Sequence, residues 1–328
     1  MNQVLTLNEN YSTTRRLFKS TLQEINSLLA QANQSEDKFQ TTFLLPEGEN
    51  RQGKGGLRTK GYFKVGGIIP QNDPLHAVAN CSENVSSPLI TVVTVVYNGE
   101  AFLEDTILSV INQTYDNVEY IIIDGGSTDG TLDIVRKYEH AIDYWVSESD
   151  KGIYDAMNKG IFLSTGKWIN FMNAGDSFST PDIMYNVSCH TDVDVIYGDA
   201  LVLYEQRPPI VRLAGLVCRL KRGSQFFHQS AFTDTYLLKK LGFDERYKFA
   251  ADFDFFFKAH LLGASFKKID CVVCNYAAGG ISDVKRVQVI REFVSIVKPN
   301  DFLKIYYANK IFMEYCKNKI KRFLNWKI

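Results

Sequence analysis

The chain has 328 residues, of which 45% are hydrophobic and 23% are charged, and its 37 basic side chains balance its 37 acidic ones. This composition excludes a mainly disordered chain, a collagen-like chain and a small disulfide-stabilised scaffold. The zero net charge argues against a uniformly basic nucleic-acid-binding protein, so we expect no nucleic-acid partner. At roughly 150 residues per domain, the length predicts about two domains, or one large α/β domain with additions.

The first region of the chain, residues 1–87, is polar and carries no recognisable targeting segment. Apolar residues at helical spacing predict a helix over residues 13–31. The first thirty residues lack the continuous apolar core of a signal peptide, and no run of 18 or more apolar residues occurs. We therefore expect a cytoplasmic protein.

A glycine-rich segment lies near the end of this region. Six glycines occur between residues 53 and 67, and this density predicts a loop or linker. The segment lacks the GxxxxGK[ST] pattern of a phosphate-binding loop. The alternative interpretation is a mobile flap that contacts the phosphates of a ligand through Lys54, Arg58 or Lys60.

From residue 88 onward, apolar strand-like segments alternate with segments of helical spacing. Unbroken β-branched runs are typical of strands that are buried on both faces. Strands that alternate with helices predict an α/β fold with a doubly wound, mostly parallel sheet flanked by helices. The predicted strands cover residues 89–97, 119–126, 142–148, 167–176 and 193–202, and the predicted helices cover residues 99–113, 131–140, 152–164 and 252–263.

Polar residues and glycines gather where three of these strands end. The first strand ends in TVVYNG (94–99), the second in DGGSTDG (124–130) and the fourth in NAGD (173–176). Ligands of open α/β sheets bind at the carboxyl ends of the strands, so these three ends together predict a pocket. The Asp124 carboxylate can accept a hydrogen bond from a base or a ribose. Asp176 offers the hard oxygen that Mg²⁺ or Mn²⁺ prefers, and the alternative is an ordinary turn aspartate.

These motifs and several later ones resemble family 2 glycosyltransferases with the GT-A fold. The likeness starts with SPLITVVTVVYNGE and EYIIIDGGSTDGT, and it continues in order with DKGIYDAMNKGI, FMNAGD, VIYGDA, FHQSAF, GFDERYKFAADFDFF and GGIS. It covers about residues 88–282 and is nearest to the bacterial branch that builds capsule, O-antigen (lipopolysaccharide) and other surface polysaccharides. It implies an inverting enzyme that moves a sugar from a nucleotide-sugar donor, expected to be a UDP-sugar, to a lipid-linked glycan acceptor.

The resemblance also implies a role for individual residues. The residues that it assigns to the nucleotide or the donor sugar are Thr94, Tyr97, Asn98, Asp124, Ser127, Lys151, Asp155 and Asn173. The family often has two or three acidic residues in its metal-binding motif, whereas this chain keeps only Asp176 there. Asn173 can still offer an amide oxygen, and we expect a divalent metal ion, Mn²⁺ or Mg²⁺, at Asp176.

Asp252 matches the late acidic residue that acts as the general base in the family. It would take the proton of the acceptor hydroxyl as that oxygen attacks the anomeric carbon. Asp254 lies two residues further along the same predicted helix and therefore points elsewhere, so we expect a structural role for it. His228 lies in a segment that the family places near the acceptor, and the alternative is a histidine with a purely structural role.

Charge is distributed unevenly along the chain. Residues 88–280 contain 17 basic and 25 acidic side chains, whereas residues 281–328 contain 11 basic and 4 acidic ones. The last stretch, residues 300–328, interleaves aromatic and basic residues, and an amphipathic helix of this kind can lie on an anionic membrane surface. The protein would then associate with the inner face of the cell membrane. The alternative is a helix that covers the catalytic domain and presents a solvated basic face.

We therefore expect an N-terminal extension with a glycine-rich linker (1–87), a GT-A catalytic domain (88–282) and basic amphipathic C-terminal helices (283–328). Two other functions stay open. A nucleotidyltransferase would need a basic glycine-rich loop directly after the first strand, where this chain has Tyr97-Asn98-Gly99. A nucleotide-sugar-binding protein without transferase activity is supported only by the low acidic content of residues 173–176.

Overall fold

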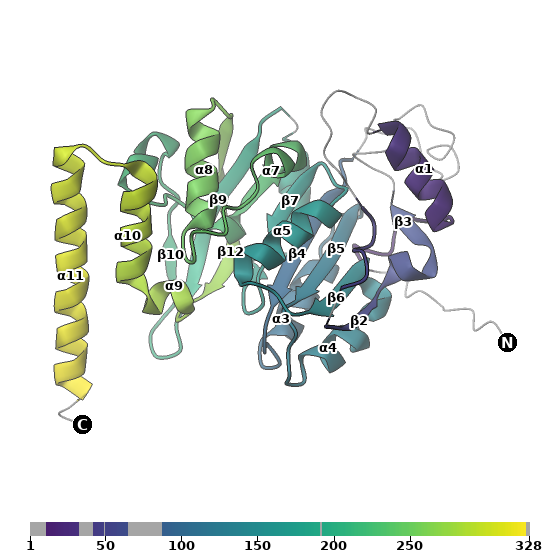
Figure 1. Cartoon of the computed structure of the whole chain (residues 1–328), viewed down its shortest axis with the longest axis horizontal. Helices are drawn as coiled ribbons and strands as arrows, with labels where there is room; N and C mark the ends of the chain where they lie inside the picture. The colour runs from purple at the N-terminus through teal and green to yellow at the C-terminus, as the bar shows by residue number, and fades with distance from the viewer. Residues whose placement is uncertain (1–10, 33–41, 49, 65–86, 191, 326–328) are drawn as a thin grey trace.

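The computed structural model places one large sheet at the centre of the molecule, with helices on both faces (Figure 1). The N-terminal elements lie at one end of the molecule and helices α10 and α11 lie at the other. The structure describes residues 11–32, 42–48, 50–64, 87–190 and 192–325.

Within the described residues the sheet contains ten strands, which follow the order β2-β6-β5-β4-β7-β11-β9-β12-β8, with β10 paired to β9. Six of the described strands (β4, β5, β6, β7, β9 and β12) run in one direction, and the other four run against them. The predicted mostly parallel sheet is therefore confirmed. The strands are β2 (Arg51–Gly55), β4 (Ile90–Val96), β5 (Val118–Asp124), β6 (Tyr144–Glu148), β7 (Trp168–Phe171), β8 (Ser177–Phe178), β9 (Val195–Leu203), β10 (Ile210–Arg212), β11 (Ala231–Asp234) and β12 (Phe266–Ala277).

Each face of the sheet carries its own hydrophobic core. Val92 of β4 packs with the side chains of α3 and α4, whereas its neighbour Val93 packs with those of α5 and α8. Because successive strand residues point to opposite faces, the unbroken apolar runs are needed to fill both cores. The helices around the sheet are α3 (Leu103–Ile111), α4 (Thr131–Lys137), α5 (Ile153–Leu163), α6 (Ile183–Ser188), α7 (Thr235–Leu241) and α8 (Ala251–Leu261).

The register of the central strands brings their carboxyl ends to one edge of the sheet. Val96 at the end of β4 lies beside Asp124 at the end of β5 in the parallel ladder. The loop after β7 joins the same edge, because the Ala174 N–H donates to the Val95 carbonyl (3.3 Å). Three of the polar loops that the sequence indicates therefore meet there.

The prediction of a linker is wrong for residues 53–64. They form the edge strand β2, the 3-10 helix η1 (Leu57–Lys60) and strand β3 (Tyr62–Lys64). The glycines of β2 allow close packing, since a Cβ on Gly55 would lie only 2.5 Å from the indole nitrogen of Trp145. The last two glycines of the segment lie outside the described residues.

The three cations of the alternative flap are held in ion pairs. Lys54 pairs with Glu47, Arg58 with Glu119, and Lys60 with Glu139 at 2.8 Å, so each cation already has an acidic partner. The predicted N-terminal helix starts later than expected. Residues 17–19 form strand β1 (Leu17–Lys19), which pairs with β3, and helix α1 spans Leu22–Ala32.

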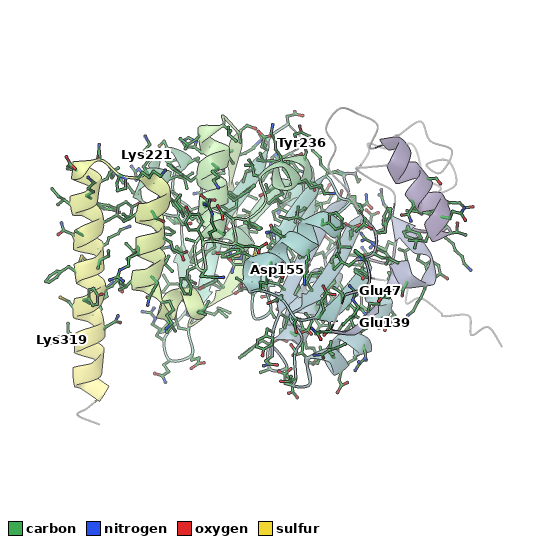
Figure 2. All side chains as sticks on the ribbon, viewed as in Figure 1. Glu47, Glu139, Asp155, Lys221, Tyr236 and Lys319 are labelled. Carbon is green, nitrogen blue, oxygen red and sulfur yellow. The ribbon has the colours of Figure 1, made fainter. Side chains whose placement is uncertain are left out.

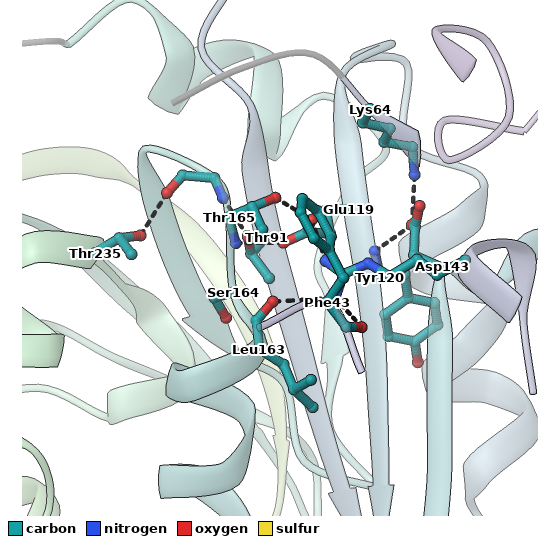
Figure 3. A network of polar contacts seen from close by, with 12 residues as sticks. Phe43, Lys64, Thr91, Glu119, Tyr120, Asp143, Leu163, Ser164, Thr165 and Thr235 are labelled. Carbon is teal, nitrogen blue, oxygen red and sulfur yellow. Dashed lines mark hydrogen bonds and ion pairs between the residues drawn. The ribbon is translucent and has the colours of Figure 1, made fainter. Parts of the chain in front are cut away.

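A buried ion pair joins the N-terminal region to the amino ends of the central strands. The side chains of Arg58 and Glu119 are each 2% exposed and form this pair. Glu119 also accepts hydrogen bonds from the Thr91 hydroxyl (2.6 Å) and the Thr165 N–H (2.8 Å), as Figure 3 shows. Burial acts to raise the pKa of Glu119, but the charge of Arg58 and the bonds from Thr165 and Thr91 hold that pKa below its ordinary value. One carboxylate therefore links the starts of β4, β5 and β7 to residue 58.

A second buried pair lies beside the first. The ammonium group of Lys64 pairs with the Asp143 carboxylate, and both side chains are almost fully enclosed. Asp143 also accepts a hydrogen bond from the Tyr120 N–H at 2.7 Å. The end of β3 is therefore held against the starts of β5 and β6.

The C-terminal region is helical, as predicted, through α9 (Ile281–Val284), α10 (Arg286–Val297) and α11 (Asp301–Asn325). Phe293 of α10 and Tyr307 of α11 share a small core with Phe253 of α8 and Leu220. Among the described residues, no helix combines the length and the hydropathy that crossing a membrane requires.

Replacing Arg58 by methionine should lower the free energy of unfolding by about 3–5 kcal/mol, because the Glu119 carboxylate would stay buried without its partner. Urea unfolding measures this loss. Arg16→Met is the matched control, since the Arg16–Asp116 pair (2.9 Å) is partly exposed and should contribute no more than about 1 kcal/mol. Equal losses in the two variants would contradict the importance of the buried pair, and Arg58→Met/Glu119→Gln should recover part of the loss.

Candidate active site

The candidate active site lies at the carboxyl ends of β4, β5 and β7 and at the start of α8. Two groups of predicted residues gather there. The first surrounds Asp124, and the second contains Asp252, His228, Asn173 and Asp176.

Asp124 organises the loop that follows β5. Its carboxylate is 1% exposed and accepts hydrogen bonds from the N–H groups of Gly126 (3.1 Å) and Ser127 (2.9 Å). The hydroxyl groups of Ser127 and Ser147 also donate to it. An aspartate that binds the backbone two and three residues further on fixes a tight turn. The loop is therefore held in one shape before any ligand arrives.

The loops after β4 and β5 are joined through Asn98. Its N–H donates to the Ser127 hydroxyl (2.7 Å), and its side-chain oxygen accepts from the Thr128 N–H (2.9 Å). Asn98 has a φ of 50°, a left-handed conformation that asparagine tolerates better than most residues. The two strand ends thus form one continuous rim.

Tyr97 and Thr94 occupy different positions relative to this rim. The Tyr97 side chain is 65% exposed, and a Cβ on Gly125 would lie 3.5 Å from its ring. Thr94 is fully buried, and its hydroxyl donates to the Met172 carbonyl (2.8 Å). Tyr97 is therefore open to a ligand, whereas the Thr94 hydroxyl is used inside the sheet.

The segment before α5 approaches the same rim. A Cβ on Gly125 would lie 2.5 Å from the Asp150 carboxylate, so this loop lies directly against the loop after β5. Asp155, labelled in Figure 2, accepts a hydrogen bond from the Lys151 N–H (3.0 Å) and lies 3.6 Å from the Lys159 ammonium. Asp155 thus fixes the start of α5, and the Lys151 side chain is exposed beside the rim.

Asp252 is held by two neighbours from other elements. Its Oδ1 accepts a hydrogen bond from the Tyr154 hydroxyl (2.9 Å), and its Oδ2 lies 3.1 Å from Nδ1 of His228. Burial acts to raise the pKa of Asp252, but the hydrogen bonds from His228 and Tyr154 bring that pKa below its ordinary value. The carboxylate is therefore ionised at neutral pH and fixed in direction.

Asn173 determines which nitrogen of His228 carries the proton. Its amide nitrogen lies 3.0 Å from Nε2 of His228. An amide NH₂ group can only donate, so Nε2 acts as the acceptor and the proton of the neutral ring is on Nδ1. The Nδ1–H group of His228 then donates a hydrogen bond to Asp252. Hydrogen bonds thus connect Asn173, His228, Asp252 and Tyr154 in sequence.

Asp176 is buried next to this hydrogen-bond network. It is 6% exposed and accepts hydrogen bonds from the Gln229 amide (2.7 Å) and the Ala277 N–H (2.9 Å). Burial raises the pKa of Asp176 to about 6. The carboxylate is therefore costly to keep charged, unlike that of Asp252.

Among the described residues, the amide oxygens of Asn173 and Gln229 are buried without a hydrogen-bond partner, and the amide nitrogen of Gln229 donates to Asp176. Carboxylate and amide oxygens are donors of the kind that Mg²⁺ and Mn²⁺ bind. No group of three His, Cys, Asp or Glu side chains comes together to hold a metal within the described ranges. The residue types present would therefore offer a divalent ion one carboxylate together with amide oxygens in place of additional carboxylates.

Sequence reasoning missed Tyr154 and Gln229 as members of the site. Tyr154 lies in the GIYDAMNKGI motif, but one apolar aromatic residue on a helix is usually packed in a core. Gln229 follows His228 directly, and nothing in the local pattern indicates that its amide reaches Asp176. The structure agrees with the structural interpretation of Asp254, whose carboxylate pairs with Lys258 at 2.6 Å.

Comparison with solved structures identifies the fold of this chain. Staphylococcus aureus TarS (residues 1–349) in complex with UDP-GlcNAc matches with a TM-score of 0.53 and 18% identity, over 68% of this chain and 70% of that one. A mannosyltransferase from Pyrobaculum calidifontis in complex with GDP-Man and Mn²⁺ matches with a TM-score of 0.52 and 20% identity, over 66% of each chain. The fold is that of the GT-A glycosyltransferases.

Sequence relatives then give the family. The model of glycosyl transferase family 2 matches residues 91–202. An uncharacterized glycosyltransferase of Mycobacterium tuberculosis (strain H37Rv) is 32% identical over 209 residues, which cover 60% of this chain and 78% of the relative. A PGL/p-HBAD biosynthesis glycosyltransferase of Mycobacterium bovis (strain BCG) is 32% identical over 183 residues, which cover 52% and 69% of the two chains. The chain belongs to glycosyltransferase family 2, as its motifs indicate.

The Asp176→Asn variant should be more stable than the parent at high pH. The Asp176 carboxyl has a pKa of about 6 in the folded protein against an ordinary value of 3.8, so its ionisation favours the unfolded chain as the pH rises. This difference costs the parent about 3 kcal/mol above pH 7. Urea unfolding in a metal chelator should give the variant an advantage that shrinks by about 2 kcal/mol between pH 8 and pH 4.5. An advantage that does not change with pH would contradict the burial of an ionisable carboxyl.

Proposed function

We propose that this glycosyltransferase moves a sugar from a UDP-sugar to a lipid-linked oligosaccharide with inversion of the anomeric carbon. The observation that carries the proposal is the Asp252 carboxylate, which is ionised and held between His228 and Tyr154 beside the rim of polar loops. The TarS complex with UDP-GlcNAc and the relative named for PGL/p-HBAD biosynthesis support a nucleotide-sugar donor and a cell-surface glycan product. The product would belong to a capsule or a lipopolysaccharide O-antigen.

The chemistry requires one base and one direction of attack. Asp252 takes the proton of the acceptor hydroxyl while that oxygen forms a bond to the anomeric carbon. The bond between this carbon and the diphosphate oxygen breaks, and the nucleoside diphosphate leaves with the electron pair. Tyr154 and His228 keep the carboxylate aimed at the acceptor, so His228 serves as a positioning residue.

The donor would lie along the rim made by the loops after β4 and β5. The exposed ring of Tyr97 offers a face for the base, and the loop held by Asp124, Asn98 and Ser127 offers a fixed surface for the ribose. Lys151 offers the nearby positive charge, and Asp155 keeps its segment in place. Thr94 would act from beneath by holding the strand end.

Asp176 and Asn173 would hold a divalent ion, Mn²⁺ or Mg²⁺, when one is bound. Such an ion supplies positive charge to the departing diphosphate. The presence of Mn²⁺ in the similar mannosyltransferase structure supports this assignment. In this chain the amide oxygens of Asn173 and Gln229 would take the place of further acidic ligands.

We also propose that residues 300–328 attach the protein to the anionic inner face of the cell membrane. The region from residue 281 onward has 11 basic and 4 acidic residues. The described part of α11 exposes large apolar side chains between its lysines, which include Phe302, Ile305 and Phe312. A lipid-linked acceptor would then be within reach of the domain.

Asp252→Asn should lower the rate of transfer by at least about 10²–10⁴-fold, because the amide cannot take the acceptor proton. Binding of the donor nucleotide, measured by calorimetry, should stay within a few-fold of the parent. Asp254→Asn is the matched control on the same helix, since that carboxylate pairs with Lys258, and it should retain transfer. Normal turnover by Asp252→Asn would show that the base is assigned wrongly.

A panel of UDP-, GDP- and dTDP-sugars with Mn²⁺ should single out UDP-sugars as the donors. A donor at 100 times its Kd stabilises the folded protein by about 2.7 kcal/mol, which a thermal shift detects. Release of the nucleoside diphosphate measures turnover in the same samples. A thermal shift without any turnover would instead support a binding protein, and a preference for GDP- or dTDP-sugars would overturn the choice of UDP.

A further inference from the structure

A cationic groove lies between the 3-10 helix η3 (Val217–Arg222) and the start of α11, and none of the candidate site residues lines it. Its volume is about 420 Å³. The residues that line it are Cys218, Arg219, Lys221, Arg222, Asn300, Phe302 and Leu303. The groove thus combines positive charge with apolar surface.

The positive charge of the groove is not balanced within the described part of the chain. Arg219, Lys221 and Arg222 are exposed, and none of them forms an ion pair with another described residue. Three exposed like charges within four residues repel one another, although water and salt screen part of this repulsion. A ligand with several negative oxygens would remove this repulsion.

Hydrogen bonds from helix α11 hold η3 in place at the groove. The Tyr307 hydroxyl donates to the Lys221 carbonyl (2.8 Å), and the Lys310 ammonium donates to the Arg222 carbonyl (3.0 Å). These carbonyls belong to the last two residues of η3, and both accept hydrogen bonds from α11. Tyr307 is 1% exposed, so the two helices are joined through a buried side chain.

The groove continues into an apolar stripe along α11. Successive helical residues are rotated by about 100°, which places five of the six exposed large apolar residues described on α11 on one side, opposite the buried Tyr307. The residues of this stripe are Phe302, Ile305, Phe312, Met313 and Ile320. Phe302 is 75% exposed and belongs to both the stripe and the groove. Figure 2 shows Lys221 beside the end where α11 begins and Lys319 towards its other end.

We propose that this groove binds the phosphate headgroups of an anionic membrane while the stripe of α11 lies among the lipid chains. Exposed cations beside an exposed aromatic side chain match the two parts of an anionic lipid. A second copy of this chain fits the face less well, because it would bring the same cations against each other. The inference rests on the proposed membrane attachment, to which it adds a headgroup site outside residues 300–328, and it does not depend on the transfer chemistry.

Sedimentation with vesicles of phosphatidylglycerol and phosphatidylcholine (30:70) tests the headgroup site. Each cation near an anionic surface is worth about five-fold in binding, so the triple variant Arg219→Gln/Lys221→Gln/Arg222→Gln should bind on the order of 100-fold more weakly. The parent should bind pure phosphatidylcholine vesicles far more weakly than the mixed ones. Phe302→Ser should also weaken vesicle binding, by several-fold, because it removes apolar area from the groove.

A charge-matched control separates a defined site from a simple effect of net charge. Lys60→Gln/Arg136→Gln/Lys137→Gln removes the same three charges from η1 and α4, away from α11 in Figure 1, and should leave vesicle binding within a few-fold of the parent. Equal losses in the two triple variants would overturn the headgroup site. If the parent protein is a dimer in solution and the Phe312→Ser variant is a monomer, a second copy of the chain covers this face, and the proposal of a membrane is overturned. Transfer to a soluble acceptor, measured in parallel, tests the proposed enzyme reaction independently of these results.

Discussion

The Glu119 carboxylate, buried at the amino ends of the central strands, is the constraint on which the rest of the sheet depends. It pairs with Arg58 and accepts hydrogen bonds from Thr91 and Thr165, so it connects β4, β5, the turn before β7 and the N-terminal region. A buried pair of this kind adds little net stability, but the loss of one partner is costly. A shift in strand register would leave a charge unpaired in the core, so the pair favours the register that the strands adopt.

The strands are fixed at their amino ends, and the candidate active site lies at their carboxyl ends. Two carboxylates there experience opposite environments. Hydrogen bonds lower the pKa of Asp252, whereas burial raises the pKa of Asp176 to about 6. Their partners are the adjacent residues His228 and Gln229 of the 3-10 helix η4 (His228–Ser230). One short helix therefore orients the proposed base and the proposed metal ligand together, and a movement of η4 would affect both.

The sequence predicts the parallel strands and helices well, because a strand buried on both faces needs an unbroken apolar run that is visible in the letters. It fails where a contact joins distant residues. From the sequence, the glycines of β2 indicate a flexible linker. In the structure, Trp145 occupies the space that a side chain at Gly53 or Gly55 would need. The bond from Tyr154 to Asp252 spans 98 positions and leaves no local pattern. The short strands β8 and β10, of two and three residues, are below the length at which periodicity is informative.

The zero net charge hides a division that bears on orientation. Residues 88–280 carry more acidic than basic side chains, and the region from residue 281 onward carries more basic ones. Charge interactions in physiological salt fade within about 8 Å, so the acidic region is hardly repelled from a membrane unless it touches the surface. An anionic membrane would therefore contact the face of the protein that carries α11 and the groove. Because Phe253 of α8 packs against Phe293 of α10 (ring centroids 4.2 Å apart), an attached α11 would be coupled through α10 to the helix that starts beside Asp252. Attachment would therefore restrict the direction from which an acceptor in the membrane reaches the proposed base.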